Sequence, residues 1–197
     1  AIVGYTTKNC GGVPANFRNW FVVKFDKPIE GYRVYDGPEK VLEGKAEFEG
    51  NHAMAVVTFK TERGEKVNAQ AASSFISLEQ AMLNFKEVEG KCFAEVKDEA
   101  KGRWNDILGR IQVGGGSDEQ IRTFYSCLYR SVLFPRKFYE INAEGQPVHY
   151  SPYNGEICDG YLYTDTGFWD TFRALFPLLN LVYPSINAEI QQGLANI

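Results

Sequence analysis

One stretch governs the interpretation of this chain: Tyr163-Thr164-Asp165-Thr166-Gly167-Phe168-Trp169-Asp170-Thr171-Phe172-Arg173. It places two carboxylates, a tryptophan and an arginine within nine residues. An apolar run, residues 174–182, follows at once and is long enough to form a buried helix. The polar cluster therefore lies at the start of a helix that packs into a core.

Two interpretations of this cluster are open from the spacing. Many proteins bind sugars with a tryptophan ring against a C–H face of the pyranose and a carboxylate that accepts hydrogen bonds from the hydroxyls. Trp169 and Asp170 would supply these groups. The alternative assigns Trp169 and Phe172 to the core, with Asp170 as a helix cap or as an ion pair with Arg173 at i, i+3. Spacing alone favours the core interpretation.

Composition limits the class of partner. The chain has 197 residues, 44% of them hydrophobic and 23% charged, which is ordinary for a globular protein. The net charge is −4 and no run of Lys or Arg exceeds two residues, so a nucleic-acid partner is not expected. No apolar run reaches the roughly 18 residues of a membrane-spanning helix. The opening Ala1-Ile2-Val3 and the helix pattern still open at Ile197 suggest a segment of a longer protein.

Residues 1–76 have a β pattern. Apolar residues alternate along 17–25, and turn residues such as Asp36-Gly37-Pro38 separate further expected strands. Those strands are expected at 29–35, 41–48, 53–59 and 67–76. Short antiparallel strands at such spacing are typical of a β-sandwich.

After residue 76 the spacing of the apolar residues becomes that of a helix. Ser77 and Ser117 each precede a Gln by three residues, which predicts a capping box at both positions. Apolar residues recur at three- and four-residue steps from Phe93 to Ile111, where Trp104 is expected to be a packing anchor. Another apolar stripe runs through 121–133, and Pro135 is expected to end that helix. Residues 77–113 are read as a helical linker and 114–197 as the start of a helical domain.

Residues 137–163 show little helical pattern, apart from a short strand expected at 138–141. This long loop, rich in tyrosine, is a suitable place for a site. His149 has no second ligand at metal spacing, and a structural role is expected for it. Cys92 and Cys127 fall in helix patterns and are predicted to be buried free thiols. No C-x-x-C pair occurs, and disulfides remain open.

A resemblance joins these motifs. The sequence resembles the family 92 glycoside hydrolases, bacterial exo-acting α-mannosidases, over about residues 70–184. The similarity rests on a set of motifs in order: Ala72–Ser77, Phe124–Ser131, Pro135-Arg136, Tyr163-Thr164-Asp165, Gly167–Ala174 and Phe176–Leu179. The Trp-Asp-Thr-Phe-Arg run is the most specific of them.

The resemblance implies an α+β multidomain fold: an antiparallel β-sandwich, a helical linker and the first helices of an (α/α)6 toroid. It implies an inverting exo-α-mannosidase, of α-1,2 type, that removes terminal mannose from glycans and uses a calcium ion. Trp169, Asp170, Arg173 and Asp165 would bind the mannose. By the same resemblance the general acid, the general base and most calcium ligands lie beyond Ile197, and the protein is bacterial and periplasmic or extracellular.

Two other classes remain open. A non-catalytic carbohydrate-binding module would explain the aromatic residues and the acidic balance equally well. Another (α/α)6-toroid glycosidase would share the architecture. No carboxylate pair in this chain is nominated as catalytic, because Asp165 and Asp170 share one loop and an inverting mechanism needs carboxyl groups on both faces of the sugar. The 197-residue chain alone is expected to be inactive.

Overall fold

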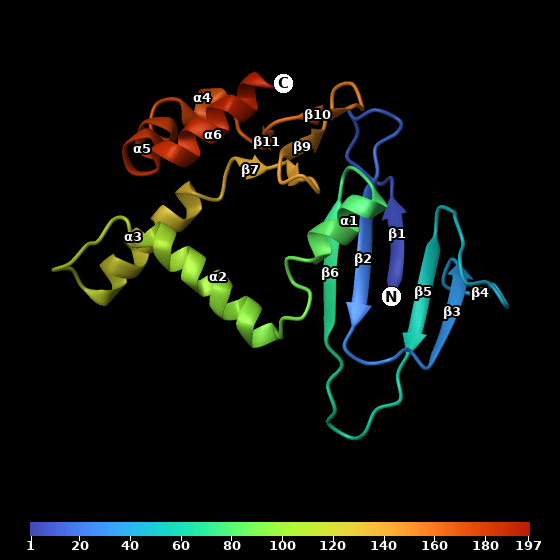
Figure 1. Ribbon diagram of the computed structural model, residues 1–197. Coiled ribbons are helices and arrows are strands. Elements are labelled where there is room, and N and C mark those ends of the chain that lie inside the picture. Colours follow the sequence, from blue (N-terminus) through green and yellow to red (C-terminus); the bar gives the residue numbers. More distant parts are fainter.

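The computed structural model describes residues 1–197 as a β part followed by a helical part, with small sheets between them (Figure 1). The β part holds two antiparallel three-stranded sheets with no helix inserted between their strands. The strand orders are β1-β2-β6 and β4-β3-β5. The bounds are β1 Ile2–Thr6, β2 Asn19–Phe25, β3 Gly31–Asp36, β4 Lys40–Val41, β5 Ala53–Thr58 and β6 Ala69–Ser74. The mixed fold with antiparallel sheets agrees with the expected α+β class.

Four of the five expected strands in this part are present within a few residues. The prediction for 41–48 is wrong, because strand β4 ends at Val41. A turn follows in which Gly44 has a φ of 67°, a left-handed conformation that breaks the extended chain. No strand pairing includes residues 42–50.

Helix α1 (Leu78–Phe85) packs its Ala81 and Phe85 against strands β6 and β2. Only one of the two hydrogen bonds of the predicted capping box at Ser77 is present. The Ser77 side chain accepts a hydrogen bond from the Gln80 backbone N–H at 3.1 Å. The Gln80 side chain turns away and donates to the Ile141 carbonyl at 2.7 Å. That contact ties α1 to the segment beyond the helices.

A carboxylate also links the β part and α1 to the segment after the helices. Glu140 accepts hydrogen bonds from the Phe75 backbone N–H at 2.8 Å and from the Asn84 side chain at 2.7 Å. The Phe75 ring stacks on Phe138 with centroids 4.6 Å apart. Two segments 65 residues apart are therefore fixed to each other by polar and aromatic contacts together.

Helices α2 (Phe93–Leu108) and α3 (Asp118–Ser131) follow. Ser117 forms the predicted capping box with Gln120, and the Trp104 ring packs on Tyr129 at 4.7 Å, which confirms its role as an anchor. Helix α3 ends four residues before Pro135. The prediction that Cys92 and Cys127 are buried is wrong, because both are exposed. Cys92 is the N-cap residue of α2, a helix with no buried residue, and Cys127 lies in α3, where only Leu128 is buried. All four cysteines are free thiols.

The segment after α3, expected to be mostly loop, contains five short strands. Three form a sheet in the order β10-β9-β8, and two form the antiparallel pair β7–β11. Their bounds are β7 Arg136–Lys137, β8 Glu140–Ile141, β9 Pro147–Tyr150, β10 Ile157–Asp159 and β11 Tyr163–Thr164. Strands of two to four residues are too short to show a period of two, so their existence depends on tertiary contacts.

The chain closes with α4 (Phe168–Thr171), α5 (Leu175–Val182) and α6 (Pro184–Ala195). They lie together beyond β7 and β11 in Figure 1. A small core gathers here from four buried side chains: Tyr163, Leu179, Tyr183 and Ile190. The prediction of a helix over the run that starts at Ala174 is confirmed, although Leu181 in that helix is 82% exposed.

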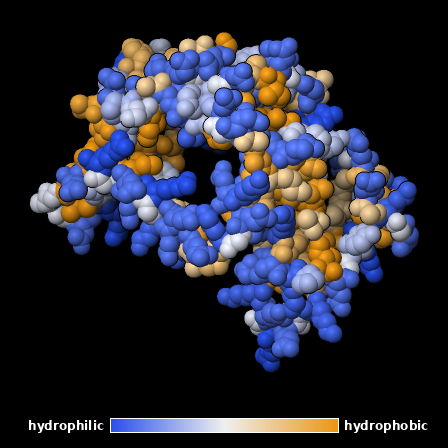
Figure 2. Space-filling view, viewed as in Figure 1, coloured by the Kyte–Doolittle hydropathy of each residue, from blue (hydrophilic) through white to orange (hydrophobic).

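Much of the helical part is uncovered. Only 18 of the 197 residues are buried, and none of them lies in α2. The accessible surface is 13896 Å², whereas a folded monomer of this mass is expected to expose about 9,400 Å². Figure 2 shows hydrophobic residues gathered at the surface over the helical part, and a hollow between that part and the sheets. No helix is both long enough and apolar enough to span a bilayer.

Gly193 provides a sharp test of the packing in the helical part. A Cβ built on this buried residue of α6 would lie 2.8 Å from the Tyr163 ring and 3.4 Å from Leu162 Cα. Alanine usually stabilises a helix interior relative to glycine by roughly 0.5–1 kcal/mol. At Gly193 the clash is expected to reverse the sign and cost about 1–3 kcal/mol of unfolding free energy.

Gly102 in α2 is the matched control, because a Cβ there would meet nothing within 4 Å. Gly102→Ala is expected to raise the midpoint of urea unfolding and Gly193→Ala to lower it. Equal shifts for both variants would show that α6 does not pack closely on β11.

Candidate functional site

The site is built on the segment that links β11 to α5. We call residues 165–173 the Trp169 turn. Asp165 has a φ of 62°, the only non-glycine residue with positive φ, a conformation that aspartate tolerates better than most residues. Its carboxylate accepts a hydrogen bond from Arg136 Nε at 2.7 Å, in an ion pair across the β7–β11 strands. This predicted sugar-binding residue therefore holds the turn and has one carboxylate oxygen already occupied.

Gly167 is the N-cap residue of helix α4 and lies close to the Asp170 side chain. A Cβ at this position would lie 2.6 Å from Asp170 Oδ2, so a larger residue here would displace the Asp170 carboxylate from its present position. The Thr171 hydroxyl donates to the Gly167 carbonyl at 2.7 Å. A four-residue helix with little core contact is thus fixed by local hydrogen bonds.

The interpretation of Trp169 and Phe172 as core residues is wrong for this chain. Trp169 is 72% exposed and Phe172 is 52% exposed, because no other element of the chain lies over α4. The Arg173 guanidinium lies over both rings, 5.2 Å from the Trp169 centroid and 4.9 Å from the Phe172 centroid. Cation–π contacts of this kind attract the guanidinium to the rings, and most of the Trp169 surface stays exposed.

Asp170 lies in the first turn of α4, with its side chain exposed. It forms no ion pair with Arg173, contrary to the expected i, i+3 pair, because the guanidinium stacks on the rings instead. An exposed carboxylate beside an exposed tryptophan is the combination that can accept hydroxyl hydrogen bonds and cover a pyranose face.

A polar cluster that the sequence did not reveal joins the β7–β11 strand pair to helix α6. We call it the Glu189 network, and it consists of Lys137, Tyr139, Tyr163 and Glu189. Glu189 Oε1 accepts hydrogen bonds from the Tyr139 hydroxyl at 2.6 Å and from the Tyr163 hydroxyl, and Lys137 Nζ lies 3.7 Å from it. Lys137 Nζ also lies 2.9 Å from the Tyr139 hydroxyl. The two tyrosines belong to an aromatic-rich segment, but nothing in the pattern of α6 marks its glutamate.

The network shifts the ionisation of its members. Burial raises the pKa of Tyr163, and its hydrogen bond to Glu189 raises it further. Burial also acts to raise the pKa of Glu189, but the hydrogen bonds from Tyr139 and Tyr163 and the nearby Lys137 charge outweigh it, so the pKa of Glu189 is lowered. The stable arrangement is an ionised glutamate with neutral tyrosines.

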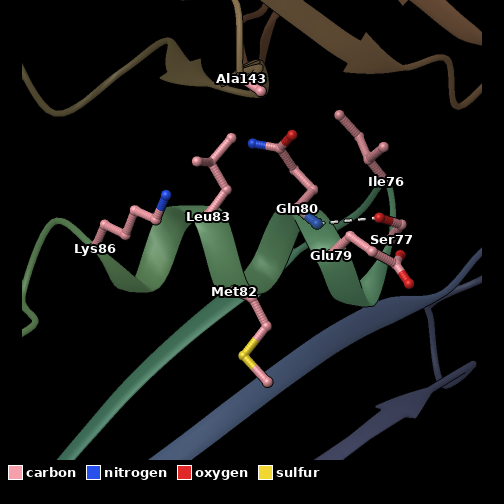
Figure 3. Close-up of a pocket in the computed structure, with 8 residues that line it drawn as sticks. All are labelled: Ile76, Ser77, Glu79, Gln80, Met82, Leu83, Lys86 and Ala143. Carbon is pink, nitrogen blue, oxygen red and sulfur yellow. Dashed lines mark hydrogen bonds between the residues drawn. The ribbon is translucent and has the colours of Figure 1, made fainter.

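Two other features carry no assignment as a site. His149 is 2% exposed and its Nδ1 lies 2.9 Å from the Gly160 carbonyl, which confirms its structural role. A groove of about 370 Å³ lies along α1. In Figure 3 its Gln80, Leu83 and Lys86 point toward Ala143 of the β8–β9 turn, while Met82 points away. The groove is lined by no aromatic side chain that could cover a sugar.

The residues present do not form a metal site. No group of three or more His, Cys, Asp or Glu side chains is arranged to hold a metal ion. Asp165 is committed to Arg136, and Asp170 has no second carboxylate with which to share a cation. Calcium is therefore assigned no ligand and no step in this chain.

Both parts of the chain match known proteins of one family. Residues 1–74 match the glycosyl hydrolase family 92 N-terminal domain, and residues 80–197 match its catalytic domain. A family GH92 inverting mannosidase from Bacteroides thetaiotaomicron is 45% identical, with a TM-score of 0.91 over 98% of this chain and 26% of that one. A second GH92 α-mannosidase from that organism, also solved with mannoimidazole, is 28% identical with a TM-score of 0.77 over 93% of this chain.

A further relative is an uncharacterised secreted glycosidase from Arthroderma benhamiae. It is 38% identical over an alignment of 78 residues, and the alignment covers 37% of this chain and 10% of that protein. The chain thus spans about a quarter of the length of the two solved mannosidases and a tenth of this relative. With both family domains matched in order along its length, the chain belongs to glycosyl hydrolase family 92.

Proposed function

We propose that the protein is an inverting exo-α-mannosidase in which the Trp169 turn binds the terminal mannose. The observation that supports this most is that an exposed aromatic ring and an exposed carboxylate lie next to each other in the Trp169 turn. The Trp169 ring is 72% exposed and oriented by Arg173, and the adjacent Asp170 carboxylate is exposed. The two solved relatives, a GH92 inverting mannosidase and a GH92 α-mannosidase, point to the same substrate class.

In this proposal the chain contributes binding and orientation. The ring of Trp169 would cover a C–H face of the mannose, and Asp170 would accept hydrogen bonds from two hydroxyls. Asp165 would act chiefly through its pair with Arg136, which holds the turn. An inverting enzyme also needs a general acid and a general base on opposite faces of the sugar. We assign neither to this chain, and we expect residues 1–197 alone to be inactive on α-mannosides.

The finer architecture also belongs to the proposal. Residues 1–76 would be part of an N-terminal β-sandwich, residues 77–113 a helical linker, and residues 114–197 the first helices of an (α/α)6 toroid. The uncovered apolar faces of the helical part support further helices packing there in the complete protein. Calcium dependence, α-1,2 specificity and a bacterial periplasmic or extracellular location rest on the family resemblance. Calcium ligands would come from other parts of the protein.

The direct test is hydrolysis by the full-length protein. We expect release of aryl alcohol from an aryl α-mannoside, little from the matched aryl α-glucoside, and loss of turnover after treatment with a calcium chelator. The α-1,2-linked mannobiose should be cleaved faster than the α-1,3-linked isomer. The isolated 197-residue chain should give no turnover in the same assay.

The alternatives predict different outcomes in this assay. Mannose binding without hydrolysis by the full-length protein would support a carbohydrate-binding module. Cleavage of the glucoside in preference to the mannoside would support another toroid glycosidase. Turnover by residues 1–197 alone would contradict the expectation that the acid and base lie elsewhere.

A further inference from the structure

We propose that Glu189 is a positioning residue that holds the Trp169 turn in its sugar-binding orientation. This inference rests on the proposed function of that turn and adds a residue to it from a different element. Glu189 belongs to α6, well away in sequence from the turn, and it contacts neither Trp169 nor Asp170 through a hydrogen bond. It acts through the strand pair from which the turn begins.

The β7–β11 pair is too short to be stable alone. It contains two residue pairs, Tyr163 with Lys137 and Thr164 with Arg136. A two-stranded ladder of this length gains little from its own backbone bonds, so side chains must fix it. Because successive side chains in a strand point to opposite faces, Lys137 and Tyr163 share one face and Arg136 lies on the other.

A carboxylate holds each face of this pair. On one face Glu189 accepts hydrogen bonds from Tyr163 and Tyr139 and attracts Lys137. On the other face Asp165 pairs with Arg136 at 2.7 Å. The contact with α6 is close, since Gly193 of that helix lies directly against Tyr163. The position and tilt of the strand pair are thus fixed to α6.

The turn follows this strand pair without a flexible linker. Asp165 comes directly after β11, and helix α4 starts three residues later at Phe168. Inside α4 the amides of Asp170 and Thr171 both donate to the Gly167 carbonyl at 3.1 Å. A shift of β11 would therefore move the Gly167 carbonyl and, with it, the Trp169 ring and the Asp170 carboxylate. A misplacement of about 1 Å is enough to lower catalysis strongly when a group must meet a substrate in a fixed geometry.

The first measurement needs no activity. Hydrogen exchange of the full-length protein is compared for wild type, Glu189→Gln and Tyr163→Phe. Glu189→Gln keeps the size of the side chain, and Tyr163→Phe removes only one hydroxyl. Both variants should speed exchange of the Asp170, Thr171 and Phe172 amides about tenfold, which corresponds to the loss of one hydrogen-bonded support. The amide of Lys86, the C-cap residue of α1, should not change.

Glu99→Gln on α2 is the matched control, because it removes a carboxylate paired with Lys91 at 2.8 Å outside the network. Unchanged exchange in the turn for Glu189→Gln and Tyr163→Phe would overturn the inference, whether or not the protein hydrolyses mannosides. Faster exchange at every amide, including those of α1, would show a general loss of stability and would also overturn it.

The second measurement is a double-mutant cycle in α-mannoside hydrolysis. Glu189→Gln should raise KM about tenfold with a smaller change in kcat. It should have little further effect in an Asp170→Ala background, because both changes weaken the same hydrogen bonds between Asp170 and the sugar. Additive effects would contradict positioning through the turn. An inactive wild type with turn-specific exchange changes would leave the positioning role standing and refute the mannosidase proposal instead.

Discussion

Replacing Asp170 by alanine in the full-length protein is expected to lower kcat/KM for an aryl α-mannoside by about 10- to 100-fold. A hydrogen bond to a charged group is worth about 1.5–3 kcal/mol. Alanine at position 170 would remove the hydrogen bonds that the exposed Asp170 carboxylate is proposed to accept from the sugar. The fold should not change, since the side chain is exposed and surface substitutions usually alter stability by less than about 0.5 kcal/mol.

Asp98→Ala, a matched removal of an exposed aspartate on α2, serves as the control and should leave the kinetics as they are. Circular dichroism of both variants should overlay that of the wild type. Wild-type kinetics for the Asp170 variant would return this residue to a purely structural role at the start of α4.

The largest effect on stability is expected at Tyr183. Its side chain is 1% exposed and is the largest fully buried one in the chain. The hydroxyl donates to the Ile107 carbonyl at 3.1 Å, and the Arg110 guanidinium lies 5.1 Å from the ring centroid, so one residue joins the end of α2 to the corner between α5 and α6. Tyr183→Ala is expected to lower the unfolding free energy by about 3–5 kcal/mol, as for other large aromatic truncations.

Tyr183→Phe separates the two contributions. It keeps the ring in the core and removes only the hydrogen bond, for which we expect a loss of about 0.5–1.5 kcal/mol. Urea unfolding of the two variants measures both values. A loss below about 1 kcal/mol for Tyr183→Ala would show that the helices around it do not form a real core.

The helices were predictable because their signals are local. Ser117 with Gln120 marks the start of α3, and the run after Ala174 marks α5. The strands around Tyr150 and Tyr163 were not predictable. Each is only two to four residues long, and its pairing depends on segments brought together by the fold.

The candidate site was only partly predictable, for a similar reason. The Trp-Asp pair at 169–170 stands out in sequence, but its exposure is decided by what packs over α4. Spacing alone favoured a core position for Trp169, and the structure leaves its ring exposed. Glu189 could not have been found from the sequence, because its role depends on hydrogen bonds from Tyr139 and Tyr163, which lie 50 and 26 residues away.

19F NMR of protein labelled with 5-fluorotryptophan tests most directly whether the Trp169 ring lies against mannose. The Trp169 resonance is assigned as the one missing from a Trp169→Phe variant. We expect this resonance to shift on titration with methyl α-mannoside, while the Trp20 and Trp104 resonances, assigned in the same way, stay in place. A Trp169 resonance that does not move while the protein is saturated with the sugar would contradict the account.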